Sequence, residues 1–448
     1  MADILAGFGG FSWAILAFIV ALSIIVTVHE YGHYIVGRWC GIKAEVFSLG
    51  FGPVLFSRHD KHGTRWQLAA LPFGGYVKFL GDANAASQPD GEAVAALSDE
   101  DAAKSMFGAA LWRRALTVLA GPVFNFVLTI IIFAVIALSR GLPVDEPKIG
   151  AIKNNPAGVS ELQAGDLILE LNGVPVDSYK AFFSQSDTIE QPTVDYLVER
   201  KGATMAITGP NPSPALVDRV SFGSAAEDAG LEEGDVIIAV NDAPVATFQN
   251  LMAIVAELDG APMRLTIWRA DADGQGATEF DVELAPRRSD LPLPEGGFET
   301  RWLIGISGST LFEPVLEAPS VWGSVSYGAS RVWSIVTGSL SALSHIVSGA
   351  ISTCNLQGPI GIAETSGNVA SNGILDFVIL IAVLSTAIGM MNLFPIPVLD
   401  GGHLLFYAYE AVTGNPPPEK ALRLLFAAGM ALVLGMMIFS VFNDFLCP

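Results

Sequence analysis

Four long apolar segments divide this chain, at about residues 11–34, 115–139, 374–397 and 421–443. Each segment is long enough to cross a bilayer as an α-helix, for which about 20 apolar residues suffice. A fifth segment, at about 318–350, contains Arg331, His345 and many Ser and Gly residues. We expect it to form an amphipathic helix that lies against the membrane or the protein without crossing the bilayer. The hydrophobic pattern therefore predicts a polytopic α-helical membrane protein with four transmembrane helices.

The loop after the first apolar segment has the pattern of β-strands. Residues 45–58 and 64–80 are rich in β-forming residues and flank the turn HDKHG at 59–63. This arrangement predicts a hairpin or a small sheet. Glycines in strands let another backbone approach closely, and this region has four of them: Gly50, Gly52, Gly74 and Gly75.

An internal repeat follows the second apolar segment. Residues 160–179 align without gaps to residues 229–248, an offset of 69 residues. Each copy has a Gly-Asp turn, an apolar strand and an Asn that opens a tight turn. The positions of the first copy that recur in the second are Leu162, Gly165, Asp166, Ile168, Asn172, Pro175 and Val176. The repeat predicts two small α+β domains, at 140–212 and 213–290.

The charge distribution indicates an orientation and excludes one class of partner. The 448 residues include 24 Lys or Arg and 45 Asp or Glu, for a formal net charge of −21. Residues 140–373 hold 13 of the basic and 30 of the acidic residues, which is unlike a nucleic-acid binder. Residues 35–114 hold nine Lys or Arg in 80 positions, about twice the density of basic residues in 140–373. The positive-inside rule then places 35–114 in the cytoplasm, and 140–373 and both termini outside.

The cysteines and the N-terminus add two expectations. Cys40, Cys354 and Cys447 are far apart and form no CxxC pair, so we expect neither a disulfide framework nor a thiolate zinc site. The N-terminus lacks the basic region and small-residue cleavage site of a secretory signal. We therefore interpret the first apolar segment as a retained membrane span.

The first apolar segment ends in His29-Glu30-Tyr31-Gly32-His33. On a helix, two His residues four positions apart lie on one face, where both can bind zinc. Ionisable groups at membrane depth are costly and usually functional. The alternative interpretation is a solvated helix end that binds no metal. We favour a hydrolytic zinc site inside the membrane.

A further acidic residue lies at the same depth. Asp400 belongs to NLFPIPVLDG at the end of the third segment, where two prolines break the helix. The first and third spans run in the same direction if 318–350 does not cross the membrane, so Asp400 can meet His29 and His33. These three side chains leave a fourth position on zinc for water, as a catalytic site requires. Glu30 could accept the proton of that water.

Three other polar side chains near these motifs allow two interpretations each. Asn125, near the cytoplasmic end of the second span, and Asn392, in the last turns of the third, could bind substrate backbone or a developing oxyanion. The alternative for both is an interhelical hydrogen bond. His403 follows Asp400 by three and is a rival ligand by spacing, but we expect it to pack on the fourth helix.

HEYGH, NLFPIPVLDG and GPVFN resemble the zinc, Asp-loop and second-span motifs of the site-2 protease family of intramembrane zinc metalloproteases. The repeat resembles PDZ domains, and a PDZ pair between the second and third spans is similar to the bacterial regulator of sigma-E protease branch. GFGP at 50–53, LPFGGYVK at 71–78 and GPIGIA at 358–363 also resemble that branch. The resemblance implies that His29, His33 and Asp400 bind one Zn²⁺ per chain, with Glu30 as the catalytic acid and base.

The resemblance also implies a function and a location. The function is regulated intramembrane proteolysis of single-span proteins already shortened by another protease, namely anti-sigma factors and, in some species, remnant signal peptides. The location is the bacterial inner membrane, in contact with lipid. The PDZ domains and both termini are then periplasmic, and the active site faces the cytoplasmic leaflet. The PDZ pair would bind peptides or restrict access of bulky substrates. The hairpin resembles a re-entrant sheet that holds substrate as an added strand.

These expectations give a domain map and a set of substrate-strand candidates. The map is 1–34 first span, 35–114 cytoplasmic loop with the re-entrant β region, 115–139 second span, 140–212 and 213–290 PDZ domains, 291–373 connector, 374–400 third span with the Asp loop, 401–420 cytoplasmic loop and 421–448 fourth span. The substrate-strand candidates are Gly50, Phe51, Gly52, Gly74 and Gly75. Two other functions remain possible on the residues alone: a membrane receptor with a structural HExxH motif, and a zinc protease that cuts soluble peptides.

Overall fold

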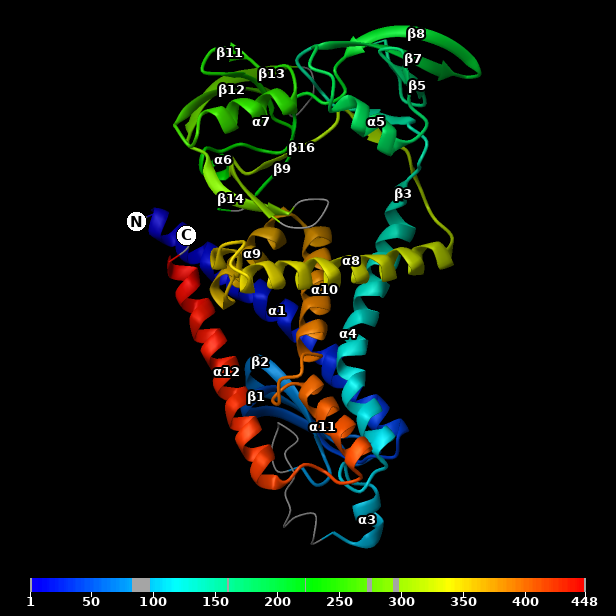
Figure 1. Cartoon of the computed structure of the whole chain (residues 1–448), viewed down its shortest axis with the longest axis vertical. Coiled ribbons are helices and arrows are strands. Elements are labelled where there is room, and N and C mark those ends of the chain that lie inside the picture. Colours follow the sequence, from blue (N-terminus) through cyan, green and yellow to red (C-terminus); the bar gives the residue numbers. More distant parts are fainter. Residues whose placement is uncertain are drawn as a thin grey trace. The chain divides into compact units, whose positions relative to one another are not determined.

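The computed structural model describes residues 2–82, 97–158, 161–221, 223–271, 276–292 and 298–446. The chain forms two compact units, drawn together in Figure 1. The first, which we call the helical unit, comprises Met1–Ile136, Val321–Ser344 and Thr353–Pro448. The second, which we call the repeat unit, comprises Ala137–Ser320 and His345–Ser352.

Four helices of the described chain are long and apolar enough to cross a membrane. They are α1 (Ala2–Trp39), α4 (Leu111–Arg140), α10 (Ile374–Asn392) and α12 (Glu419–Leu446). Their number and places agree with the four predicted spans, except that α10 ends at Asn392 and not at 397. The segment at 318–350 forms the helix α8 (Val321–Val347), which does not qualify as a span. Gly328 of α8 lies against the backbone of Ile130, so α8 crosses α4 closely (Figure 1).

The chain between α10 and α12 differs from the prediction. Residues 401–420 were predicted as a loop, but they contain most of the helix α11 (Asp400–Thr413). The third span therefore does not continue to residue 400: it breaks after Asn392, and Asp400 is the first residue of the next helix. Gly401 and Gly402 pack so closely on the carbonyls before them that a Cβ at either position would clash. This packing is a tertiary feature that no hydropathy pattern reports.

The β region is a bent two-stranded sheet, as predicted. The strands β1 (Ala44–His59) and β2 (Arg65–Phe79) are antiparallel. Gly50 and Gly52 have φ values of 85° and 84° and bend β1, so that both halves of β1 pair with β2. The segment 44–49 lies between 75–79 and 65–68, while 51–59 pairs with 65–71. The segment 75–79 is thus an edge of the sheet, and no further strand of the described chain pairs with it.

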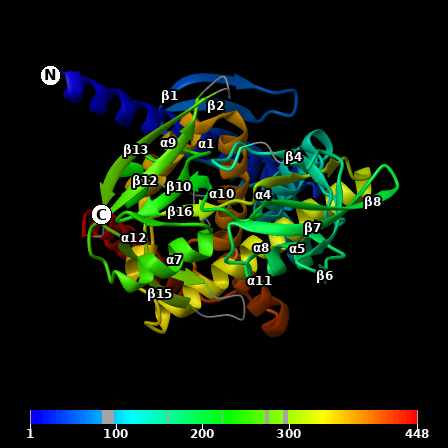
Figure 2. The same ribbon diagram turned by 90° about the horizontal axis from the view of Figure 1, so that it is seen from above.

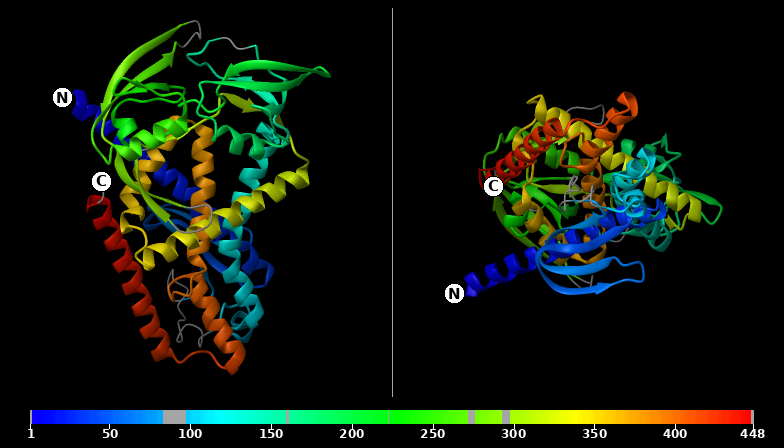
Figure 3. Two further views of the ribbon diagram at one scale, coloured as in Figure 1. Left: turned by 45° about the horizontal axis from the view of Figure 1, so that its top comes forward. Right: turned by 90° about the horizontal axis from the view of Figure 1, so that it is seen from below.

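The turn of this sheet is attached to α1. The Asp60 carboxylate accepts hydrogen bonds from Tyr34 Oη at 2.9 Å and Trp66 Nε1 at 3.1 Å. It also accepts from the backbone N–H groups of His62 and Thr64. Burial raises the pKa of Asp60, but these hydrogen bonds outweigh burial and lower the pKa to about 2. The sheet therefore lies alongside α1, as Figure 3 shows.

Buried hydroxyl groups join α4 to α10. Thr129 Oγ1 donates to the carbonyl of Ala382 at 2.8 Å, and Thr386 Oγ1 donates to Thr129 Oγ1 at 2.9 Å. Ser385 Oγ donates to the carbonyl of Asn125 at 3.0 Å. Interhelical hydrogen bonds of this kind stabilise helix pairs in apolar surroundings. They hold the Asn125 turn of α4 against α10.

A largely buried ion pair, with side chains 11% and 18% exposed, joins the start of α4 to the end of α11. The Arg114 guanidinium binds the Glu410 carboxylate through two hydrogen bonds, of 3.1 Å and 2.5 Å. Removing one partner of a buried pair leaves the other charge uncompensated, which costs about 3–5 kcal/mol. We expect Glu410→Gln to lower the free energy of unfolding by about that much, measured by denaturation in detergent micelles.

A matched control for this prediction is available on α12. Glu419 pairs with Arg423, but both side chains are largely exposed, at 76% and 83%. An exposed helical pair of this kind contributes about 0.3–0.5 kcal/mol. Glu419→Gln is therefore expected to leave the denaturation midpoint nearly unchanged. Equal shifts for the two substitutions would contradict the role given to Arg114 and Glu410.

The end of α12 is attached to the loop before α9 (Pro359–Asn372). The Asn443 amide donates to the carbonyls of Thr353 and Leu356, and the Asp444 carboxylate accepts from the backbone of Gly358. Cys354, in the short helix η1 (Thr353–Asn355), is disulfide-bonded, and its partner lies outside the described residues. The cysteine spacing predicted no disulfide framework and did not reveal this single disulfide, because spacing along the chain does not report proximity in the fold.

The repeat unit contains two four-stranded sheets with the same strand order, β6-β5-β7-β8 and β11-β10-β12-β13. The strands of the first are β5 (Leu167–Leu171), β6 (Val174–Pro175), β7 (Thr193–Arg200) and β8 (Ala203–Pro210). Those of the second are β10 (Val236–Val240), β11 (Ala243–Pro244), β12 (Met263–Ala270) and β13 (Ala277–Leu284), seen side by side in Figure 2. Each sheet packs with one helix, α5 (Tyr179–Ser186) or α7 (Phe248–Glu257). The smaller elements are α3 (Asp99–Ala103), α6 (Ala225–Asp228), β3 (Leu142–Pro143), β14 (Arg287–Pro292), β15 (Phe298–Leu303) and β18 (Leu316–Glu317).

The two copies of the predicted repeat also contain equivalent ion pairs. Arg200 binds the buried carboxylate of Asp166 through Nε at 2.6 Å, and Arg269 binds Asp235 in the same way at 2.6 Å. Both members of the second pair follow the first by the repeat offset of 69 residues. Hydrogen bonds from Arg200 outweigh the burial that raises the pKa of Asp166, so this pKa lies below its usual value. The two copies therefore share one folding pattern.

The boundary predicted after residue 290 is wrong. The strand β16 (Ile306–Gly308) pairs with β9 (Val217–Val220) of the second copy. The chain then returns to the first copy, where β17 (Phe312–Pro314) pairs with β4 (Ile149–Ile152). The strands β16 and β17, within the stretch predicted as a connector, thus complete both copies. Because the chain returns from the second copy to the first, the aligned repeat in the sequence does not reveal these strand pairings.

Candidate active site

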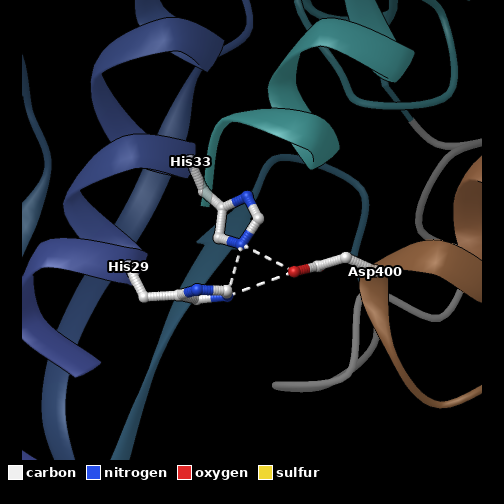
Figure 4. Close-up of side chains that lie close together, drawn as sticks. All are labelled: His29, His33 and Asp400. Carbon is white, nitrogen blue, oxygen red and sulfur yellow. Dashed lines mark hydrogen bonds and ion pairs between the residues drawn. The ribbon is translucent and has the colours of Figure 1, made fainter. Parts of the chain in front are cut away.

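The structure brings together three predicted ligands from α1 and α11. His29 and His33 are one helical turn apart on α1, and both are buried. Their Nε2 atoms are 3.1 Å apart, and Asp400 Oδ2 lies 3.1 Å from the first and 3.5 Å from the second. Figure 4 shows the two imidazoles and the carboxylate pointing at one another. Such a cluster of two nitrogens and one oxygen can hold a metal ion.

Glycine keeps the space beside this cluster open. A Cβ at Gly121 of α4 would lie 2.8 Å from His29 Nε2 and even closer to His33 Nε2. A Cβ at Gly32 would lie 2.6 Å from the carbonyl of Ala120, so α1 and α4 approach closely here. Any side chain at residue 121 would occupy the point at which the imidazoles converge.

The chemistry of the three groups fits a zinc ion. His33 Nδ1 lies 2.8 Å from the carbonyl of Thr117 and donates its hydrogen to it, so a neutral His33 presents a lone pair at Nε2. Asp400 Oδ2 is buried and within ion-pair distance of both imidazoles, yet it makes no hydrogen bond to either. Three lone pairs facing one another without a proton or cation between them repel. A Zn²⁺ ion relieves this repulsion, and two His and one carboxylate are a set that catalytic zinc uses.

A cavity of about 180 Å³ adjoins the cluster, lined by Glu30, Asn392, His403 and Tyr407 among others. Val77 and Phe79, from the edge segment 75–79, form another part of its wall. Asn392 donates one amide hydrogen to the carbonyl of Ile388 at 3.1 Å while still lining the cavity. The candidate ligands therefore share one cavity with the Glu30 carboxylate, the Asn392 amide and the strand edge 75–79.

The five substrate-strand candidates lie at two places. Gly75 is next to the site: a Cβ there would be 3.4 Å from Glu30 Cγ. The ring of Phe51 packs on Gly74 and stacks on Tyr76 at 5.9 Å between centroids. None of Gly50, Phe51 and Gly52 lines the described cavity, and they lie where the sheet bends. Gly75 thus lies on the strand edge near the site, whereas Gly50, Phe51 and Gly52 lie at the bend of the sheet, away from the cavity.

Asn125 fits one of its two interpretations and not the other. It is fully buried and does not line the cavity, and its amide Nδ2 lies 3.3 Å from His29 Nδ1. The predicted contact with substrate does not fit this position, whereas the alternative of an interhelical contact does. The residues missed by the sequence analysis are Thr117 and Gly121, which face the same two histidines. Their signal was the spacing of four that places residues 117, 121 and 125 on one face of α4.

His403 packs as expected. Its ring lies 5.6 Å from that of Phe426 on α12 and 6.3 Å from that of Phe406. It is no member of the described cluster of ligand atoms, which comprises His29, His33 and Asp400. His59 and His62 are exposed in the turn of the β sheet, far in sequence from any ligand.

The fold and the site together define a membrane protein with a candidate metal-dependent hydrolase centre. The model of peptidase family M50 matches residues 17–436. A protein of Agrobacterium fabrum named "Putative zinc metalloprotease" is 34% identical over 447 residues, covering 99% of this chain and 98% of the relative. Metalloprotease MmpA of Caulobacter vibrioides is 32% identical over 444 residues, covering 97% and 96%. The chain belongs to peptidase family M50, the site-2 protease family, and is a metalloprotease.

Proposed function

We propose that this protein is an intramembrane zinc endopeptidase that cleaves single-span membrane proteins. The observation that carries the proposal is the convergence of His29, His33 and Asp400 beside Glu30, on a helix long and apolar enough to span a membrane. We assign the first three as ligands of one Zn²⁺ per chain and Glu30 as the catalytic acid and base. A zinc-ligand role for the convergent side chains is also supported by the metalloprotease names of the relatives.

Each residue of the site has a separate role in peptide hydrolysis. Zinc, when bound, supplies a Lewis acid that polarises the scissile carbonyl and lowers the pKa of water. Glu30 takes the proton of the attacking water and passes it to the leaving amine. Asn392, on the wall of the cavity, donates a hydrogen bond to the oxygen on which negative charge develops. The buried surroundings strengthen this hydrogen bond because they exclude competing water.

The edge of the β sheet gives a way to present the substrate. A helical substrate keeps its peptide groups in internal hydrogen bonds, so it must unwind before hydrolysis. An unwound segment can pair with the free edge at 75–79, whose Val77 and Phe79 line the cavity. Gly75 lets that segment approach the Glu30 side of the site. In this arrangement Gly50, Phe51, Gly52 and Gly74 shape the sheet that carries the edge.

The basic residues and one disulfide support an orientation. The basic loop 35–114 faces the cytoplasm under the positive-inside rule, which places the active site towards the cytoplasmic leaflet. Disulfides form in oxidising compartments, so the bonded Cys354 supports a periplasmic position for the loop before α9. The proposed location is the bacterial inner membrane, with the repeat unit in the periplasm.

We assign the two copies of the repeat unit as PDZ domains. The second copy has a groove of about 490 Å³ between α7 and β15, lined by Phe248, Met252 and Ile304 among others. It supports peptide binding by that copy, and the copies can also restrict bulky substrates. The proposed substrates are anti-sigma factors and remnant signal peptides that a first protease has shortened.

Metal removal tests the proposal. We expect a strong chelator to abolish cleavage of a purified single-span substrate by the full chain in micelles, and added Zn²⁺ to restore it. Asp400→Ala should lower bound zinc, because it removes one of three ligands. His62→Ala is the matched control, since His62 is exposed and outside the cluster. Unchanged zinc content and unchanged function in Asp400→Ala would instead support the receptor interpretation.

A further inference from the structure

One buried side chain behind the candidate ligands has an unusual hydrogen-bonding position. Asn125 is 0% exposed on α4, and its Oδ1 is buried with no hydrogen-bond partner. Its Nδ2 faces His29 Nδ1 at 3.3 Å. A buried amide oxygen without a partner destabilises the fold and calls for an explanation.

The chemistry of His29 supplies the explanation. Its Nε2 faces Asp400 Oδ2 and His33 Nε2, so Nε2 is the nitrogen available to a metal. A neutral imidazole that binds through Nε2 carries its hydrogen on Nδ1. An N–H of His29 would then face the NH₂ group of Asn125, and two donors cannot form a hydrogen bond. Rotating the amide by half a turn keeps its shape and places Oδ1 against Nδ1–H.

We infer that Asn125 is a positioning residue that accepts the Nδ1–H of His29 and so keeps Nε2 free for the metal. The inference rests on the zinc site of the proposed function. His33 has the equivalent arrangement, because its Nδ1 lies 2.8 Å from the carbonyl of Thr117. Both acceptors come from α4, four residues before and four residues after Gly121. One helix thus fixes the tautomer of both histidines.

The position of Asn125 is itself fixed by neighbouring groups. Its carbonyl accepts a hydrogen bond from Ser385 Oγ at 3.0 Å, and Thr129 Oγ1 lies 3.2 Å from the same carbonyl oxygen. A Cβ at Gly389 of α10 would lie 3.1 Å from the Asn125 Cβ, so α10 packs directly on this residue. The side chain therefore has little freedom to turn away from His29 towards the cavity.

The test compares variants that differ in the acceptor. Asn125→Leu and Asn125→Ala remove the acceptor, with and without retention of bulk, while Asn125→Asp retains it in the same shape. We expect the first two to weaken zinc binding by about 10- to 100-fold, as is typical when the hydrogen-bond partner of a ligand is lost. Asn125→Asp should bind zinc about as tightly as the unsubstituted protein. Affinity is measured on the full chain in micelles by competition with a chromogenic chelator.

The outcomes separate this inference from the proposed function. If the unsubstituted protein binds zinc and His33→Ala abolishes binding, the metal site stands. Unchanged zinc affinity in both Asn125→Leu and Asn125→Ala would then overturn the role of Asn125 alone. A loss in Asn125→Asp equal to that in Asn125→Ala would also overturn it, since the acceptor retained by Asp should restore zinc binding. Where Asn125→Leu fails to fold, equal zinc affinities of Asn125→Ala and Asn125→Asp would still overturn the role.

Discussion

Glu30→Gln is expected to abolish cleavage of a single-span substrate while zinc remains bound. Glu30 lines the cavity beside His29 and His33 but is no member of the cluster of ligand atoms. Glutamine has nearly the same shape and cannot accept the proton of water. Because proton transfer by a positioned side chain contributes about 10²- to 10⁴-fold to rate, kcat should fall by that factor. Cleavage is followed on gels, and zinc is measured by elemental analysis of the same preparation.

A control on another helix separates this effect from a general loss of charge. Glu419→Gln makes the same chemical change at an exposed position of α12 and should leave both cleavage and zinc content unchanged. Full activity in Glu30→Gln would refute the acid and base role. Loss of zinc together with activity would mean that Glu30 supports the metal and does not transfer the proton.

Gly121→Ala is expected to weaken zinc binding and cleavage together. The added Cβ would lie 2.8 Å from His29 Nε2 and closer still to His33 Nε2, so one of the imidazoles must move. Overpacking of this kind costs about 1–3 kcal/mol, which corresponds to roughly 5- to 150-fold in zinc affinity. Alanine stabilises a helix interior relative to glycine by about 1 kcal/mol. The loss therefore cannot come from weaker helix formation in α4.

The chain contains a matched substitution for this prediction. Gly435 lies in α12, and a Cβ there would meet nothing within 4 Å. Gly435→Ala should leave zinc affinity, measured by chelator competition, and the rate of cleavage unchanged. Equal behaviour of the two variants would show that the backbone approach at Gly121 does not shape the site.

The HExxH motif and Asp400 show how far the sequence alone could locate the site. The spacing of His29 and His33 places both on one face of any helix, so the pair follows from local geometry. The direction of the spans brings Asp400 to the same end. Asn125 could be placed near this site but not in its role, because the sequence does not report that its side chain turns to His29 and away from the cavity.

In the repeat unit, too, the sequence predicted some features and missed others. The offset of 69 residues predicted two similar folds, and the pairs Asp166–Arg200 and Asp235–Arg269 extend that similarity to ion pairs. The return of the chain through β16 and β17 was missed, since strands this short pair with partners far away in sequence. Next to these strands, Ile304 packs in the core of the second copy, and Leu311 and Phe312 pack in the core of the first.

By itself, the sequence determined the four apolar helices, the β region, the repeat and the three side chains that converge, because periodicity and spacing act locally. Only the tertiary structure decided that Asp400 begins a helix, that Gly121 leaves room at the imidazoles, and that Thr117 and Asn125 lie behind them. These features depend on how closely α1, α4, α10 and α11 pack. Close packing arises from contacts between distant segments, and no local pattern in one segment specifies its partner.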